Sequence, residues 1–345
     1  MSNKLVSVII TTYGVPSKLD RALRSVLNQT YQNIEIIVVD DNNPDTKTRL
    51  KTEIAMSAYQ DNARVKYLKH DKNQNGAAAR NTGILAANGE YIAFLDNDDI
   101  YLETRIEKSV EYLNIHNDDA GVLTSVILTE EGFPVSIVTP NCGSDICYQI
   151  LCGKTTLGTG SNLFFRKGIF TDIGMFDTRF LRYQDLEFFL RVASKYRIGC
   201  IDDQLIIKDS EIGKLAGYRK MREMTDLYLK KYEYMISSMP KEDQQSIYLF
   251  HYSNLFEWAI QAGDVAGING EYENLRKNGL IRDYHQVLYK KRKLKSGKFA
   301  LVRTLKGIRL TKELLRIIRK KSIQSRAKKA FSKEEINYIR SSLEH

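Results

Sequence analysis

The chain of 345 residues contains 43% hydrophobic and 10% aromatic residues, which is ample for a buried core and excludes global disorder. No basic region followed by an apolar one opens the chain, and no stretch approaches the ~20 apolar residues of a membrane helix, so we expect neither a signal peptide nor a membrane span. The net charge of +10 is concentrated between positions 286 and 330, where 17 Lys or Arg stand against one acid, and this asymmetry indicates an anionic partner.

The first part of the chain alternates apolar runs with helical spacing. Strands are predicted at residues 5–12, 34–39, 65–68 and 91–95. Helices are predicted at residues 17–28, 45–59 and 73–89, the last entered through a glycine-tipped loop. Continuous apolar strands separated by helices are typical of parallel βαβ units. The pattern therefore predicts an α/β fold.

The same reading continues to about residue 207. Helices are predicted at 103–114 and 185–196, strands at 121–128, 134–138 and 198–207, and a small-residue loop feeding a strand at 155–165. Beyond residue 216 the strand signal ends, and helices follow at 218–239, 241–263 and 265–278. We expect three parts: a catalytic α/β domain at 1–215, a helical appendage at 216–285 and basic amphipathic helices at 286–345.

The basic segment has a helical pattern of its own. Between residues 299 and 321 the apolar positions fall near one helix face and Lys or Arg fill much of the rest. A basic amphipathic helix is typical of a segment that lies on an anionic membrane surface. One alternative is a helix that packs its apolar face on the body. Nucleic-acid binding is disfavoured because the segment lacks interleaved aromatic residues and a reader motif.

The four cysteines, Cys142, Cys147, Cys152 and Cys200, have neither CxxC spacing nor a histidine pattern. This absence favours scattered cytosolic thiols over a disulfide or zinc framework.

An acidic loop ends the predicted strand at 91–95. Asp96, Asp98 and Asp99 surround Asn97, and three carboxylates so close together repel one another unless a cation or hydrogen-bond donors face them. Open α/β sheets bind ligands at the carboxyl ends of their strands. Mn²⁺ or Mg²⁺ takes oxygen ligands, often one or two carboxylates plus substrate phosphates. The alternative is that Asp98 or Asp99 caps the helix that follows.

Other polar side chains at predicted strand ends suit a nucleoside diphosphate. Thr11 offers a hydroxyl, Tyr13 an aromatic face and Asp41 an acceptor. Asn75 and Arg80 offer partners for phosphate, which matches the planar guanidinium geometrically. Simpler explanations exist for each: a strand edge for Thr11, an exposed ring for Tyr13, a helix cap for Asp41 and a surface ion pair for Arg80.

Four stretches in order, SVIITTYG, IEIIVVDDNN, NGAAARNTGILAANGEYIAFLDNDD and GMFDTRFLRYQDLEFFLR, resemble family 2 glycosyltransferases of the GT-A fold. The resemblance covers residues 4–210 and implies a mixed, mostly parallel sheet flanked by helices. It also implies an inverting, metal-dependent transfer of a sugar from a nucleotide donor, expected to be a uridine diphosphate sugar. The acceptor is expected to be a saccharide, lipid-linked, in bacterial surface polysaccharide assembly at the cytoplasmic face of the membrane.

The resemblance assigns roles to single residues. Asp96 and Asp98 fall on the family's DxD motif, with Asp98 the metal ligand, and Asp185 falls on the catalytic base. The base- and ribose-binding positions of the family are Thr11, Tyr13 and Asp41. The QxxRW motif of processive members is missing, so we expect addition of a single sugar.

The chain departs from the family at two positions. Gly14 replaces the usual Asn after the first-loop tyrosine, and Gln184 replaces the usual Glu before the base. Gln184 keeps hydrogen bonding but drops a charge at a position expected to face the donor sugar. By resemblance, the small residues Gly160 and Ser161 are expected to lie near the acceptor.

The expected chemistry needs a base. An acceptor hydroxyl is a poor nucleophile near neutral pH, so a carboxylate must take its proton during attack. A helix N-terminus stabilises Asp185 as the anion, although an ordinary helix cap would occupy the same place. One rival function is a sugar-nucleotide nucleotidyltransferase, which needs a glycine-rich cationic first loop. The loop TTYGVPSK of this chain is a poor version of that loop. The other rival function is a non-catalytic membrane-tethered scaffold. The sequence leaves a homo-oligomer open.

Overall fold

The computed structural model describes residues 3–14, 16–143, 145–154, 157–210, 217–295 and 322–344. By their contacts these residues form two compact units. The α/β unit comprises residues 1–150, 155–212 and 327–345, and the helical unit comprises residues 151–154 and 213–326. The amphipathic helix predicted at 299–321 lies outside the described residues.

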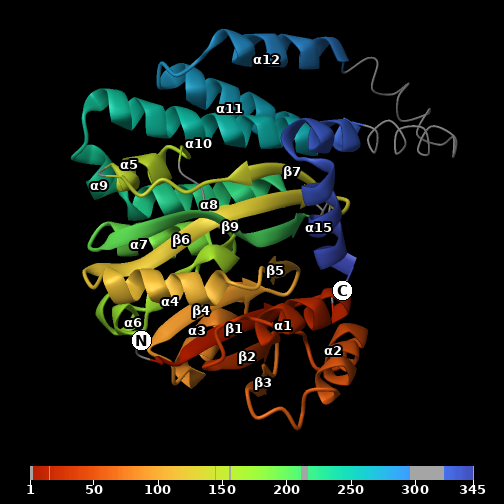
Figure 1. The fold of residues 1–345 in the computed structure, drawn as a ribbon. Coiled ribbons are helices and arrows are strands. Elements are labelled where there is room, and N and C mark those ends of the chain that lie inside the picture. The colour runs from red at the N-terminus through yellow and green to blue at the C-terminus, as the bar shows by residue number, and fades with distance from the viewer. Residues whose placement is uncertain are drawn as a thin grey trace, which may run out of the picture. The chain divides into compact units, whose positions relative to one another are not determined.

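In its described residues, the α/β unit is built around a nine-stranded sheet (Figure 1). Its parallel half contains, in spatial order, β3 (Val65–Lys69), β2 (Ile34–Asp40), β1 (Val6–Thr12) and β4 (Tyr91–Asp96). The order continues with β8 (Phe164–Arg166), β6 (Asp119–Glu130), β9 (Arg197–Ser210) and β5 (Asp99–Tyr101). Strand β6 runs parallel to β9, whereas β8, β5 and β7 (Phe133–Val138) pair antiparallel to their neighbours.

Helices flank this sheet. The longer ones are α1 (Leu19–Leu27), α2 (Lys47–Ser57), α3 (Gly76–Ala86), α4 (Arg105–Ile115), α7 (Gln184–Ala193) and α15 (Lys333–Glu344). Short helical turns are η1 (Pro16–Lys18), α5 (Ile146–Leu151), η2 (Gly160–Asn162) and α6 (Gly168–Asp172). The mixed α/β fold with flanking helices is thus confirmed, and the predicted elements recur with small shifts at their ends. Strand β5 is an addition that the sequence reading missed, whereas α15 lies in the range 286–345 where helices were expected.

Both faces of the parallel strands are buried, which explains their continuous apolar runs. On one face, Val8 and Ile10 pack in a core cluster with helices α1 and α4. On the other face, helix α3 lies close to β1, because a Cβ atom on Gly83 would come within 2.3 Å of Ile9. This packing fixes α3, and with it the side chain of Arg80, against the sheet.

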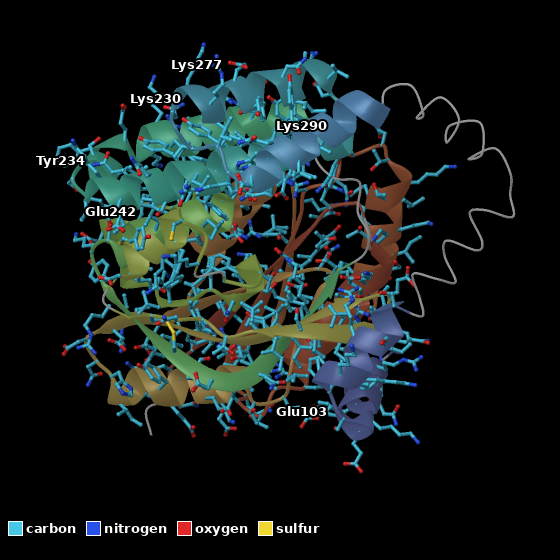
Figure 2. The ribbon with its side chains drawn as sticks, turned by 90° about the horizontal axis from the view of Figure 1, so that it is seen from above. Glu103, Lys230, Tyr234, Glu242, Lys277 and Lys290 are labelled. Atoms are coloured by element: carbon cyan, nitrogen blue, oxygen red, sulfur yellow. A yellow bond between two sulfur atoms is a disulfide. The ribbon has the colours of Figure 1, made fainter. Side chains whose placement is uncertain are left out.

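The helical unit contains α8 (Tyr218–Lys231), α9 (Glu233–Ser237), α10 (Lys241–Ala262), α11 (Val265–Lys277) and α12 (Asp283–Lys295), as Figure 1 shows. The predicted break after α10 is confirmed: Gly263 ends the helix at φ 71° and Asp264 caps α11 by accepting from the amide of Gly267. Tyrosines contribute to its core, where the rings of Tyr272 and Tyr289 stack with centroids 4.0 Å apart. Tyr234, labelled in Figure 2, is exposed on this unit.

The prediction of four unpaired thiols is wrong for Cys142 and Cys200. The fold brings their Cα atoms to 6.2 Å and a disulfide joins them, seen as the yellow bond in Figure 2. The two residues lie 58 positions apart, so no local spacing could reveal the pair. Cys147 and Cys152 carry thiol groups outside this disulfide, as predicted.

Across the described ranges, no helix combines the length and the apolar character that crossing a lipid bilayer requires.

Candidate active site

The carboxyl ends of the central strands meet at one edge of the sheet. Thr11 on β1 pairs in register with Val39 on β2 and with Asp96 on β4. Asn97 donates to the hydroxyl of Thr12 at 2.9 Å, which ties the acidic loop to the end of β1. The predicted nucleotide-binding positions on β1 and β4 are therefore neighbours.

Asp41 is buried at the end of β2 and its carboxylate already accepts several hydrogen bonds. His70 Nδ1 and the amide of Gln74 each lie 2.7 Å from Oδ1, and the Asn73 side chain donates to Oδ2 at 2.7 Å. Helix α2 is capped by Thr46, so the alternative role of Asp41 as its cap is wrong. The structure makes Asp41 an organiser of the 70–74 loop, which lies beside the sheet edge.

Hydroxyl groups at the η2 turn form hydrogen bonds with the acidic loop. Ser161 Oγ accepts from the amide of Asp96 at 2.9 Å and donates to Asp99 Oδ2 at 2.6 Å. Thr159 Oγ1 donates to the same Asp99 oxygen at 2.5 Å. The alternative in which Asp98 or Asp99 caps a helix is wrong, because Thr104 occupies the N-cap position of α4.

Arg80 connects the acidic loop to helix α7. Its Nη2 lies 2.7 Å from Asp96 Oδ1 and its Nη1 donates to Gln184 Oε1 at 2.9 Å. The guanidinium is buried and lies over the ring of Phe176, with its Nε unpaired in the structure. A surface ion pair within its own helix is therefore excluded for Arg80, and the missing charge at Gln184 leaves Asp96 as its acidic partner.

Asp185 is the second residue of α7 and is partly exposed. Tyr183, not Asp185, occupies the N-cap position. A Cβ atom built on Gly160 would lie 3.1 Å from Arg80 Nη2 and 3.6 Å from Asp185 Oδ2. The absence of a side chain at Gly160 thus lets the η2 turn approach both the arginine and the expected base.

Lys208 on β9 is a central residue that the sequence reading missed. It pairs in register with Asp99 on β5. Burial lowers the pKa of its ammonium, but Asp99, Asp96, Asp185 and Asp98 all raise it, and the net pKa shift is upward. The acidic loop and the expected base Asp185 therefore both raise the pKa of one lysine, although Asp185 lies 86 to 89 positions from the acids of the loop.

Burial dominates the electrostatics of the acidic loop. Burial raises the pKa of Asp98, and the neighbouring charge of Asp96 raises it further. Burial likewise raises the pKa of Asp99 to about 7, against the opposing effect of Lys208. The repulsion that raises the pKa of Asp98 would be relieved by a bound cation.

The donor set suits a hard cation, because Asp96 and Asp98 present carboxylate oxygens of the kind that Mn²⁺ and Mg²⁺ bind. No group of three or more His, Cys, Asp or Glu side chains is assembled for a metal in the parts of the chain that the structure describes. Such ions are commonly held by one or two carboxylates together with substrate phosphates.

Two strained residues flank the Arg80–Gln184 contact. Asn75 has φ 80° and Tyr183 has φ 63°, values that cost residues other than glycine roughly 1–3 kcal/mol. The side-chain oxygen of Asn75 accepts from the amides of Ala77 and Ala78, so it caps α3. Such strain persists where the surrounding structure enforces it and is frequent at functional sites.

The structure thus brings several of the expected site residues together. Arg80, Asp96, Gly160, Gln184 and Asp185 are linked by direct contacts or close approach. Tyr13 is 60% exposed at the neighbouring loop. The residues that sequence reasoning missed are His70, Thr159 and Lys208. Asp99 stood in the acidic stretch, whereas His70, Thr159 and Lys208 gave no local signal.

Comparison with known proteins identifies the family. The model described as "Glycosyl transferase family 2" matches residues 7–174. An uncharacterised glycosyltransferase of Methanocaldococcus jannaschii is 30% identical over 210 residues, which are 60% of this chain and 71% of that protein. Glycosyltransferase GlyG of Streptococcus pneumoniae is 42% identical over 150 residues, which cover 43% of this chain and 48% of GlyG.

A third relative has a detailed name. The Escherichia coli protein WfgD, named UDP-Glc:alpha-D-GlcNAc-diphosphoundecaprenol beta-1,3-glucosyltransferase, is 30% identical over 177 residues, which are 48% of this chain and 67% of WfgD. For several relatives the match spans less than half of the relative. It covers, for example, 44% of a Haemophilus influenzae glycosyltransferase.

Solved structures give weaker matches. S. aureus TarS aligns with a TM-score of 0.49 at 15% identity over 78% of this chain and 55% of TarS. Mannosyltransferase PcManGT from Pyrobaculum calidifontis aligns with a TM-score of 0.49 at 15% identity over 85% and 86% of the two chains. The sequence relationship is the stronger finding, and by it this chain belongs to glycosyl transferase family 2 and is a glycosyltransferase.

Proposed function

We propose that this protein transfers a single sugar from a nucleoside diphosphate donor, a uridine diphosphate sugar, to a hydroxyl of a saccharide acceptor with inversion at the anomeric carbon. The observation that carries this proposal is the gathering of Asp185, Gly160, Arg80 and Asp96 at one edge of the sheet. A carboxylate that can act as a base lies there beside the acidic loop.

Asp185 is the residue that takes the proton. Its carboxyl group lies in the first turn of α7, beside Gly160 and Arg80. Attack by the acceptor oxygen forms the bond to the anomeric carbon and breaks the bond to the diphosphate, which leaves with the electron pair. The hydroxyl proton passes to Asp185 as the bond forms. A single base opposite the leaving group is the arrangement of in-line displacement.

The leaving group needs positive charge. Lys208 supplies a fixed cation that interacts with Asp96, Asp98 and Asp185. Asp98, with Asp96 beside it, would hold a Mn²⁺ or Mg²⁺ ion, which supplies Lewis-acid stabilisation of the departing diphosphate when bound. Arg80 orients Asp96 toward the donor through the 2.7 Å ion pair.

The acceptor class follows from relatives and charge. WfgD carries a diphosphoundecaprenol acceptor in its name, and we propose a lipid-linked saccharide for this protein as well. The excess of Lys and Arg between residues 286 and 330 suits an anionic membrane surface. We therefore propose a peripheral location at the inner face of the cytoplasmic membrane, in surface polysaccharide assembly.

The test is turnover by the purified protein. A panel of UDP-sugars and GDP-mannose is incubated with Mn²⁺ and a saccharide or lipid-linked acceptor, and release of nucleoside diphosphate is measured. Asp185→Asn and Asp98→Asn are expected to abolish release, whereas the surface controls Asp172→Asn and Asp203→Asn are expected to leave it unchanged, because both acids pair with exposed lysines. Omission of Mn²⁺ should lower release.

Two outcomes would contradict the proposal. Full activity in Asp185→Asn would remove Asp185 as the base. Nucleotide binding without turnover for any donor and acceptor would favour a scaffold that retains the sugar-nucleotide fold.

A further inference from the structure

Arg21 on helix α1 joins four separate parts of the α/β unit. Its Nη1 donates to the carbonyl oxygen of Leu343 in α15 at 2.7 Å. Its Nη2 donates to the carbonyl oxygen of Asp98 at 3.2 Å and to Asp209 Oδ2 on β9 at 2.9 Å. The side chain is 13% exposed, so these bonds are shielded from water. One guanidinium therefore links the C-terminal helix to the backbone of the acidic loop.

The chemistry of each contact favours a fixed arrangement. The carbonyl of Leu343 lies in the last turn of α15, where carbonyl groups lack helical partners and carry the negative end of the helix dipole. A planar guanidinium can serve several acceptors at once, which an ammonium does less well. Asp209 is held from a second side by Lys18 at 2.9 Å. The arginine is thus locked from several directions.

Apolar packing holds α15 in the same place. Phe331 and Ile339 lie in one buried cluster with Ile100 on β5, Ile127 on β6 and Ile207 on β9. Ile100 is two residues beyond Asp98, and Ile207 is next to Lys208. Figure 1 shows α15 alongside the sheet, and Figure 2 shows Glu103, just after β5, labelled beside it. Helix α15 therefore packs against strands β5, β6 and β9, and β5 directly follows Asp98 of the acidic loop.

We propose that helix α15 fixes the backbone of Asp98 through Arg21, so that Arg21 is a positioning residue of the acidic loop and the C-terminal helix is a working part of the nucleotide site. The consequence for nucleotide binding rests on the proposed function. The consequence for the loop does not, since it follows from the hydrogen bonds alone.

Amide hydrogen exchange in the full-length protein tests the structural part. In Arg21→Met, exchange of the amides at residues 96–99 is expected to rise about tenfold, the effect of losing a charge-assisted hydrogen bond. Arg24→Met is the matched control, because Arg24 lies on the same helix, is largely exposed and interacts with Asp20 and Tyr59. The double variant Phe331→Ala and Ile339→Ala loosens α15 and should also raise exchange in the loop.

Calorimetric binding of UDP tests the consequence. In Arg21→Met the dissociation constant is expected to rise roughly ten- to a hundredfold, the range seen when a residue that orients a ligand group is lost. Exchange at 96–99 equal to that of Arg24→Met would overturn the proposal, as would loosening of α15 without any change at 96–99. Should the wild-type protein bind no nucleotide, the proposed function fails, while the exchange experiment still decides the role of Arg21.

Discussion

Arg80 on α3 and Asp96 at the end of β4 form an ion pair, with 2.7 Å between Nη2 and Oδ1. The same guanidinium donates to Gln184, the residue before the proposed base. A single side chain therefore sets the first acid of the loop and the start of helix α7 relative to each other. In a site of this kind a small displacement of either group is costly, because reacting groups must be held in position.

Replacement of Arg80 by lysine should uncouple these two groups. Lysine keeps the charge but cannot donate from two rigid nitrogens to Asp96 and Gln184 at once. We expect kcat/KM to fall roughly tenfold or more, as for other residues that orient a site. Steady-state kinetics with the exposed control Arg276→Lys would check this. Equal activity of the two variants would show that the simultaneous contact of Arg80 with Asp96 and Gln184 has no role in activity.

Gly160→Ala should lower activity with little effect on stability. The new Cβ atom would lie 3.1 Å from Arg80 Nη2 and 3.5 Å from the Cβ of Asp185, so the arginine must shift by a few tenths of an ångström. The matched control is Gly168→Ala, where a Cβ atom would meet nothing within 4 Å. Measurement of kcat and melting temperature for both separates an effect on the site from an effect on folding. A loss of activity common to both variants would argue against this explanation.

The helical unit should lose stability in acid through His251. Burial lowers the pKa of His251 to about 4 from an ordinary 6.5, and its Nε2 donates to the carbonyl of Leu151 at 2.9 Å. Between pH 6.5 and 4 the unfolded chain therefore binds a proton that the folded protein does not. The free energy of unfolding falls as pH drops through this window.

His251→Gln keeps a donor toward Leu151 and removes the titration. The decline of melting temperature from pH 7 to pH 5 should be shallower in this variant than in the wild-type protein. The control His116→Gln changes an exposed histidine and should retain the wild-type slope. The attribution to His251 is wrong if all three slopes coincide.

Reduction of the Cys142–Cys200 disulfide should destabilise the α/β unit. Opening a cross-link between residues 58 positions apart restores chain entropy to the unfolded state, typically about 2–4 kcal/mol. Urea unfolding with and without dithiothreitol would show a lower midpoint under reducing conditions. The double variant Cys142→Ser and Cys200→Ser should be insensitive to the reductant, and sensitivity in that variant would point to another cause.

The sequence by itself determined the local structure of this protein. Continuous apolar runs specify β1, β2 and β4 because a strand buried on both faces tolerates little else. The sharp change from apolar to acidic residues at Asp96 marks the end of a strand, and the motif order indicates the family. Each of these patterns is formed by residues close together in the sequence, so it can be recognised without knowledge of the fold.

Only the tertiary structure decided which distant residues meet. Arg21 and Leu343 are 322 positions apart, and the pKa of Lys208 is raised by acids from two segments, the acidic loop and the start of α7. Cys142 and Cys200 gave no spacing signal, yet the sheet brings them together. Such pairs depend on strand order and on the packing of helices against the sheet. No local pattern encodes that order, because the free energy of each long-range contact is realised only when the whole core has formed.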